Sequence, residues 1–271
     1  MANQSDHRPN SANARALTTP AALRWLPVWQ RNFRVWVKLA GSAILGNFGE
    51  PLLYLLALGY GLGSFIGHVQ EMPYIQFLAS GIVCSSAMVT ASFEGMYSTY
   101  TRMEVQKTWD AMLATPLAIK DIVIGETIWA GTKSLFSGAA ILIVAALLGA
   151  VASWLAVFAL PVVLLTGFCF AAMALVITAF ATNYDFFLYY YTLVITPILL
   201  LSGVFFPLEE MPSVIQWSAQ IFPLTHAVAL VRPLITGAAL HHVLLHLLVL
   251  SGYTLLTLSL AIALLRRRLM A

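Results

Sequence analysis

The run FFLYYYTLVITPILLLSGVFF (186–206) carries no charged side chain. Prolines repeatedly interrupt the stretch that follows it, PLEEMPSVIQWSAQIFPLTHAVALVRPLITGAALHH (207–242). The first run matches the length of about 20 apolar residues that a helix needs to cross a bilayer. The connection 203–242 is too polar to span, and it is broken by Pro207, Pro212, Pro223 and Pro233. Because proline ends or kinks a helix, this connection predicts two short helices, about 211–221 and 224–236, that enter the membrane only partway.

Five further apolar stretches surround this one. The chain is 60% hydrophobic and 9% charged, with a mean hydropathy of +0.85, whereas a soluble domain carries about 25% charged residues. The additional predicted spans cover residues 38–62, 74–98, 122–149, 154–182 and 243–265. Together with 186–206 they define an all-α integral membrane protein with six transmembrane helices.

The basic residues indicate the orientation. Twelve of the 14 fall in three groups: Arg8, Arg15, Arg24, Arg31, Arg34 and Lys38 before the first span, Arg102, Lys107 and Lys120 in the loop 99–121, and Arg266, Arg267 and Arg268 at the end. Basic residues mark the cytoplasmic side of membrane proteins. Both ends and the loop 99–121 are therefore expected inside, and the connection 203–242 outside. The net charge of +3 does not indicate nucleic-acid binding.

The N-terminal part divides in two. Residues 1–22 are polar and predict a disordered cytoplasmic tail. Residues 23–37 predict an amphipathic helix, with Trp25, Trp29, Phe33 and Trp36 on one face and Arg24, Arg31, Arg34 and Lys38 on the other. Such a helix lies in the membrane interface with its aromatic side inward. The six-span domain is expected over 38–268.

The cytoplasmic loop 99–121 reads TYTRMEVQKTWDAMLATPLAIKD. Met103, Trp109, Met112 and Leu113 recur at roughly helical spacing before Pro116, which favours a short helix parallel to the membrane. A large Trp and two Met in a cytosolic loop indicate a docking surface, although a solvated linker fits the same composition.

Four charged residues fall inside predicted spans: Glu50, Glu94, Glu126 and Lys133. Burying one such charge at mid-bilayer costs at least ~2.5–3.5 kcal/mol, so each is expected to face protein or a watery cavity and to be paired. Glu126 and Lys133 share one helix face about 10 Å apart. The four form either a polar patch that senses a substrate or a set of ion pairs that hold the helices together.

Other groups allow two interpretations each. The aromatic cluster that includes Tyr189 and Tyr190 either stacks on sugar rings or forms an interfacial aromatic belt. His242 and His246 are one helical turn apart, but no Cys or carboxylate lies near them in sequence, so we expect an interfacial pair and no metal site. Cys84 and Cys169 lie in apolar runs and are expected to be buried thiols.

The chain resembles the permease subunits of type-2 ABC exporters. The segments that carry the resemblance are GNFGEPLLYLLALGYGLG (46–63), FLASGIVCSSAMVTASFEGMY (77–97), KTWDAMLATPL (107–117), DIVIGE (121–126), NYDFFLYYYTLVITP (183–197), LVITPILLLSGVFFPLEEMP (193–212) and FPLTHAVALVRPL (222–234). They are most similar to the members that export lipo-chitooligosaccharides during nodulation. The resemblance covers about residues 24–268.

The resemblance implies partners and site residues. Such permeases carry no ATPase domain, and GTKS (131–134) is not a phosphate loop, because Thr127 and Thr132 stand where that motif needs glycine. ATP and Mg would therefore be bound by a separate ATPase, two copies of which would join a permease homodimer in the bacterial inner membrane. The implied coupling helix contains Arg102, Glu104, Trp109, Asp110, Met112, Leu113 and Pro116. The external re-entrant loop contains Glu209, Glu210, His226 and Arg232, and no cofactor is expected on the chain itself.

The expected function is ATP-driven export of a lipid-linked oligosaccharide through a polar path that includes Glu50, Glu94, Glu126, Lys133, Tyr189 and Tyr190. Another glycolipid, a polysaccharide or a drug is an alternative cargo. A proton-coupled carrier that uses Glu50, Glu94 and Asp185 is an alternative of another class, although its typical internal repeats are not evident. The sequence offers no motif for an intramembrane transferase or hydrolase.

Overall fold

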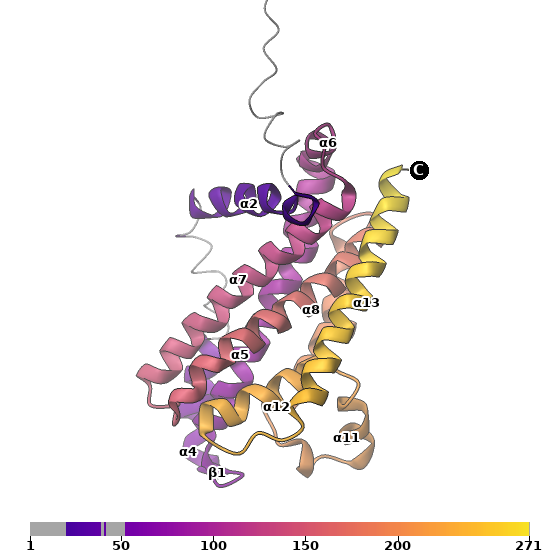
Figure 1. Ribbon diagram of the computed structural model, residues 1–271. Helices are drawn as coiled ribbons and strands as arrows, with labels where there is room; N and C mark the ends of the chain where they lie inside the picture. Colours follow the sequence, from indigo (N-terminus) through magenta and orange to yellow (C-terminus); the bar gives the residue numbers. More distant parts are fainter. Residues whose placement is uncertain (1–19, 39–40, 42–51, 271) are drawn as a thin grey trace, which may run out of the picture.

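Long helices form the body of the computed structural model, which describes residues 20–38, 41 and 52–270 (Figure 1). Four helical segments are long and apolar enough to cross a membrane: Tyr74–Val105, Ile119–Leu147, Trp154–Phe180 and Val243–Met270. The first comprises α5 (Tyr74–Phe93) and the π-helical turns η3 (Glu94–Ser98) and η4 (Thr101–Val105), and the others contain α7 (Ile119–Leu147), η5 (Trp154–Phe158) with α8 (Ala159–Phe180), and α13 (Val243–Met270). They coincide with four of the six predicted spans, so the chain is an all-α, multi-pass membrane protein.

The other two predicted spans are represented by shorter helices. Leu52–Ile66, which includes η2 (Ala57–Leu62) and α4 (Gly63–Ile66), covers the second half of the predicted span 38–62. Most of the first half, with Glu50, lies outside the described residues. The predicted span 186–206 corresponds to Asp185–Leu201, made of α9 (Asp185–Tyr190), η6 (Tyr191–Ile195) and α10 (Thr196–Leu201). A total of six spans stays a prediction.

The proline-rich connection forms two helices that meet at a sharp bend. A short turn, η7 (Leu208–Glu210), leads to α11 (Ser213–Ala219), and α12 (Pro223–Thr236) follows at 90° to it. Pro223 occupies the first turn of α12, where its missing N–H costs no hydrogen bond. Gly237, with φ of +81°, ends the helix in the left-handed conformation that glycine adopts without strain. These helices match the predicted pair 211–221 and 224–236.

The two ends of the bundle differ (Figure 1). The helix α2 (Leu26–Lys38), the short helix α6 (Thr108–Leu113) and the C-terminus lie at one end. At the other end lie α11, α12 and the hairpin of β1 (His68–Val69) and β2 (Met72–Pro73), in which His68 pairs with Pro73. The remaining element is the turn η1 (Ala21–Leu23), just before α2.

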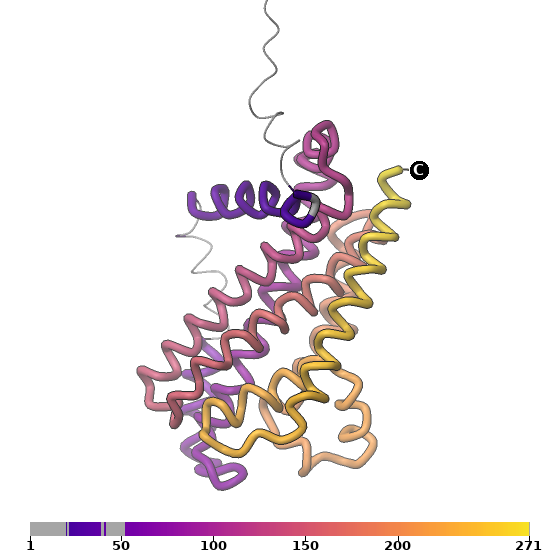
Figure 2. The backbone as a smooth tube through the Cα atoms, in the orientation of Figure 1, coloured from indigo at the N-terminus to yellow at the C-terminus, as the bar shows by residue number. Residues whose placement is uncertain are grey.

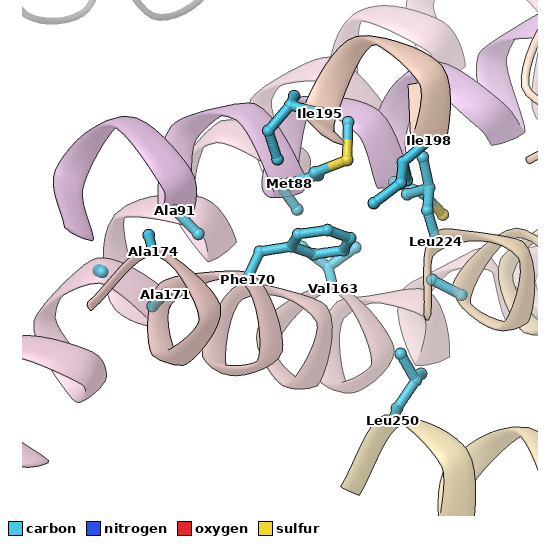
Figure 3. Close-up of a cluster of buried hydrophobic side chains, with 14 of the residues drawn as sticks. Met88, Ala91, Val163, Phe170, Ala171, Ala174, Ile195, Ile198, Leu224 and Leu250 are labelled. Carbon is cyan, nitrogen blue, oxygen red and sulfur yellow. The ribbon is translucent and has the colours of Figure 1, made fainter. Parts of the chain in front are cut away.

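Small residues let the central helices approach closely. A Cβ atom added to Gly95 would lie 2.7 Å from the Cβ of Ala174 and 3.0 Å from the carbonyl oxygen of Ala171. Figure 3 shows the Phe170 ring projecting from α8, the helix of Ala171 and Ala174, toward Met88 on α5. Close contact through small residues is the usual way in which membrane helices pack, because lipid offers no hydrophobic driving force between them.

The helix α2 crosses the end of the bundle and packs against α7 (Figure 2). Val28 and Asn32 are buried in this contact, the Trp29 indole donates to Thr132 Oγ1 at 3.0 Å, and the Trp36 ring stacks on Phe136. Part of the aromatic face that was predicted to enter the membrane interface is therefore covered by protein. This packing surface could not be predicted from the local sequence pattern, because α7 supplies it from far along the chain.

Candidate functional site

Two buried carboxylates and one arginine form the centre of the site. Glu94 on η3 is 3% exposed and Glu126 on α7 is 1% exposed. The guanidinium of Arg102 on η4 bridges them: Nη1 lies 2.8 Å from Glu94 Oε1, while Nε donates to Glu126 Oε1 at 3.0 Å and Nη2 contacts Glu126 Oε2. The fork on Glu126 is the bidentate geometry that makes arginine–carboxylate pairs strong and directional.

Other donors complete the coordination of each carboxylate. Glu126 also accepts from Asn32 Nδ2 at 3.0 Å and from the Trp109 indole at 3.4 Å. Glu94 also accepts from Lys133 Nζ at 2.7 Å and from the Trp129 indole at 2.9 Å. A buried ion pair is tolerated when hydrogen bonds satisfy its remaining lone pairs. We refer to Asn32, Glu94, Arg102, Trp109, Glu126, Trp129 and Lys133 as the ionic network.

Irregular backbone brings these groups together. Glu94 begins one π-helical turn and Arg102 lies in the next. A π-helical turn accommodates an extra residue and is common at functional sites. Lys107 then adopts a left-handed conformation, with φ of +49°, and turns the chain into α6. The Trp109 side chain is thereby directed inward toward Glu126.

A cavity of about 500 Å³ lies beside the ionic network, where α2 meets the bundle. Its wall carries the cations of Arg31, Arg102 and Lys133 and four aromatic rings, which belong to Trp36, Tyr97, Trp129 and Tyr184. The Tyr97 and Tyr184 rings are stacked, with their centroids 6.1 Å apart and an angle of 6° between their planes. The cavity thus combines positive charge with flat apolar surfaces.

Arg31 is the cation of this wall that lies outside the long helices. It donates to Asn32 Oδ1 at 3.0 Å and to Thr108 Oγ1 at 3.4 Å. Burial lowers the pKa of the Arg31 guanidinium from its ordinary value, the positive charge of Arg102 lowers it further, and Glu126 raises it. The positive charges of Arg31, Arg102 and Lys133 on the wall would favour an anionic or strongly hydrogen-bonding group in the cavity.

The structure brings Glu94, Glu126 and Lys133 together. Glu126 and Lys133, which share one helix face, do not form an ion pair with each other. Glu126 pairs with Arg102, and Lys133 pairs with Glu94 on another helix. Tyr189 is 65% exposed and Tyr190 is buried, and neither lines the cavity. Sequence reasoning did not single out Tyr97, Trp129 and Tyr184, which do line it. The position of Tyr184, just before the predicted span 186–206, was the available signal.

A short helix, α6, forms within the segment predicted to couple to an ATPase, but the Trp109 side chain is not exposed on it. Its side chain is fully buried against the ionic network, so the expectation that it docks a partner directly is wrong. Arg102 is likewise occupied inside the chain. Asp110 and Pro116 are exposed, and Met112 and Leu113 are half-buried.

Glu104 joins this region to the C-terminal helix. Its carboxylate lies 2.8 Å from Arg268 Nη2 and 3.2 Å from Lys107 Nζ. Arg268 also donates from Nη1 to the carbonyl oxygens of Thr178 and Ala179 at the end of α8. The segment before α6 is thereby tied to both α8 and α13.

At the opposite end of the bundle lies Arg232, a residue of the predicted external loop, on α12. It is folded into the protein, where Nε donates to Ser80 Oγ at 3.0 Å, Nη2 donates to the Gly203 carbonyl at 2.6 Å, and the guanidinium lies 3.7 Å from the centroid of the Phe77 ring. A side chain this close to a ring face gains cation–π attraction.

The other predicted residues of the external loop lie around it. The imidazoles of His226 and His246 face each other with Nδ1 atoms 2.8 Å apart, whereas the sequence had suggested a pair of His242 and His246. Glu209 accepts from Gln70 Nε2 at 2.7 Å, and Glu210 is exposed.

Comparison with known proteins identifies the class. The family model described as ABC-2 type transporter matches residues 25–236, so the chain belongs to the ABC-2 type transporter family, whose members are membrane subunits of transporters. The resemblance predicted from the sequence segments is confirmed.

The relatives refine this assignment. The chain is 47% identical over 247 residues to Nodulation protein J of Rhizobium meliloti (strain 1021), covering 91% of this chain and 94% of that protein. It is 48% identical over 255 residues to Nodulation protein J of Rhizobium leguminosarum bv. viciae, covering 93% and 98%. It is 26% identical over 209 residues to the inner membrane transport permease YadH of Escherichia coli (strain K12), covering 76% and 78%.

Proposed function

We propose that this chain is the permease of an ATP-driven exporter that moves a lipo-chitooligosaccharide-like glycolipid out of the cytoplasm. Two copies would form a homodimer in the bacterial inner membrane and would work with two separate ATPase subunits, which bind ATP and Mg. The family membership and the similarity to the nodulation proteins support this assignment. Another glycolipid, a polysaccharide or a drug is the alternative cargo.

The observation that carries the proposal is the lining of the 500 Å³ cavity. Aromatic rings such as Tyr97 and Tyr184 offer flat faces on which a sugar ring can lie, and the basic side chains of Arg31 and Lys133 offer hydrogen-bond donors for its oxygens. In this scheme the oligosaccharide head enters between α2 and the bundle while the acyl chain stays in lipid.

The proposed topology places α2, α6 and both termini in the cytoplasm. Six spans then cross the membrane, with the first and fifth built around Leu52–Ile66 and Asp185–Leu201. The bent pair of α11 and α12 enters the membrane from outside as a re-entrant loop. The distribution of basic residues supports this orientation.

The ion pairs of Glu94 speak against the proton-coupled alternative. A proton carrier needs a carboxylate that exchanges protons readily, whereas Glu94 is held by Arg102 and Lys133. Two adjacent cations favour its charged form strongly. Asp185 is exposed at the start of α9 rather than placed in the bundle.

We expect Tyr184→Ala to reduce export at least about fivefold, because loss of an aromatic anchor in a binding contact typically costs more than ~1 kcal/mol. Tyr184→Phe should retain most export, since it keeps the ring and loses only the hydroxyl contact with Thr101 at 2.7 Å. The matched control is Tyr189→Ala, which removes an exposed tyrosine outside the cavity. The measurement is radiolabelled lipo-chitooligosaccharide secreted by a deletion strain carrying each variant, normalised to permease in the membrane. Equal export by Tyr184→Ala and Tyr189→Ala would contradict the proposed cavity function.

Asp110→Arg is expected to abolish co-purification of the ATPase and export while leaving the thermal stability of the permease unchanged. Asp110 is exposed on α6, and a reversed charge at an interface adds repulsion, whereas exposed substitutions usually change stability by about 0.5 kcal/mol or less. Asp185→Arg, an exposed acid off α6, serves as control and also tests the proton-carrier alternative. Normal complex yield for Asp110→Arg would mean that α6 is not the docking element.

A further inference from the structure

A second cavity, of about 390 Å³, lies at the other end of the bundle. It is lined by α12, the residues that follow α10, η7, the β1–β2 hairpin and the start of α13. Its wall includes Arg232, Ser202, Thr225 and Glu209. All of these belong to the described part of the chain, and none of them contributes to the ionic network or the first cavity.

Arg232 brings a half-buried positive charge to this wall. Its guanidinium is fixed from one side by Ser80, the Gly203 carbonyl and the Phe77 ring. No carboxylate of a described residue forms an ion pair with it within 4.0 Å, and its Nη1 donates to no described residue. Arginine presents five N–H donors in a planar fork, so part of the fork is available to a ligand.

Two hydroxyl groups on the same wall also lack partners. The side-chain oxygens of Ser202 and Thr225 are buried and form no hydrogen bond with the described residues. Ser202 is 1% exposed and Thr225 is 6% exposed. Leaving a buried hydroxyl unsatisfied is unfavourable, and native proteins satisfy the great majority of such groups. Both hydroxyl groups can therefore donate a hydrogen bond to a ligand bound in the cavity.

The one carboxylate on the wall lies at a more open position. Glu209 is exposed and already accepts from Gln70. The buried part of the cavity thus offers donors and positive charge. A neutral sugar would satisfy the hydroxyls but leave the charge of Arg232 without a counter-ion.

We propose that this cavity binds a phosphate-type oxyanion, either as free phosphate or as the phosphodiester of an anionic lipid headgroup. Arg232 supplies the charge through its free guanidinium nitrogen, and Ser202 and Thr225 donate hydrogen bonds to the remaining oxygens. The site is separate from the proposed export cavity, and its existence does not depend on the export function.

The test uses the full chain in nanodiscs of phosphatidylcholine, with Tm as the readout. One arm titrates inorganic phosphate against sodium chloride of equal ionic strength, and the other replaces part of the phosphatidylcholine by phosphatidylglycerol. A ligand that binds only the folded state raises Tm as its concentration exceeds its Kd. A shift with phosphate identifies the free anion, and a shift with phosphatidylglycerol alone identifies the headgroup.

The decisive variant is Ser202→Ala/Thr225→Val. Because neither hydroxyl has a partner in the free protein, we expect the unliganded Tm to stay the same or rise, and the affinity for the anion to fall about 10-fold. Ser92→Ala is the matched control, since its hydroxyl is also buried without a partner but lies outside the cavity. Glu209→Gln should strengthen binding several-fold by removing a negative charge.

Two results would overturn the proposal. One is the absence of a Tm shift with either phosphate or phosphatidylglycerol in the wild-type chain. The other is an equal shift in the double variant and in Ser92→Ala, which would show that the hydroxyls do not contact the anion. Because neither variant removes Arg232, the test does not depend on whether the chain folds without that side chain.

Discussion

Glu126→Ala is expected to lower the free energy of unfolding by about 3–5 kcal/mol, the cost of breaking a buried ion pair by removing one partner. The change would leave the Arg102 guanidinium without its bidentate acceptor and would leave Asn32 and Trp109 without an acceptor for their N–H groups. The measurement is reversible unfolding of the purified chain in mixed micelles. Glu104→Ala is the control, because its pairs with Lys107 and Arg268 are partly exposed and such pairs are worth about 0–1 kcal/mol.

A second variant separates charge from packing. In Arg102→Met/Glu126→Ala the uncompensated guanidinium is gone, so the double variant should be less destabilised than the sum of the two single variants. A loss of stability for Glu126→Ala no larger than for Glu104→Ala would show that the ionic network does not hold these helices together.

Gly125→Ala is expected to displace α2 from α7. A Cβ atom at this position would lie 2.6 Å from Val28 Cβ and 2.9 Å from the Trp25 carbonyl oxygen. Since the second contact is with backbone, rotation of a side chain cannot relieve it. Overpacking of this kind costs about 1–3 kcal/mol, which is roughly a 5- to 150-fold loss of the docked state.

Limited trypsin digestion measures this displacement, because Arg31 and Arg34 lie on α2, and cleavage after them requires this helix to leave its packed conformation. Faster cleavage after these arginines, together with reduced export, is the expected result. Gly252→Ala on α13 is the matched control, as its added methyl group meets no atom within 4 Å. Cleavage at the wild-type rate in Gly125→Ala would mean that α2 tolerates the methyl group without moving.

The sequence was sufficient for the long helices and the bent pair. Apolar runs of membrane length predicted the helices that contain α5, α7, α8 and α13, and the spacing of the prolines predicted α11 and α12 to within a few residues. Both signals are local, because span length and proline chemistry depend on neighbouring residues alone. The same reasoning established that Glu94, Glu126 and Lys133 need partners.

The identity of those partners was beyond local reasoning. Arg102 and Glu126 are 24 residues apart, and they meet because of two π-helical turns and the left-handed Lys107. No residue pattern in the sequence predicted these backbone features. The same turn buries Trp109, which the sequence suggested as a surface anchor. The surroundings of Arg232 could not be predicted for a related reason: Ser80, Phe77 and the Gly203 carbonyl, which contact its guanidinium in place of water, come from distant parts of the chain.

The helical segment Tyr74–Val105 runs without interruption between the two cavities. Near one of its ends Ser80 holds Arg232, and near the other Glu94 and Arg102 form part of the first cavity wall. A rotation of this segment as one body would change the shape of both cavities together. A ligand in one cavity would then alter the affinity of the other cavity for its own ligand, and thermodynamic reciprocity requires the effect to be equal in both directions.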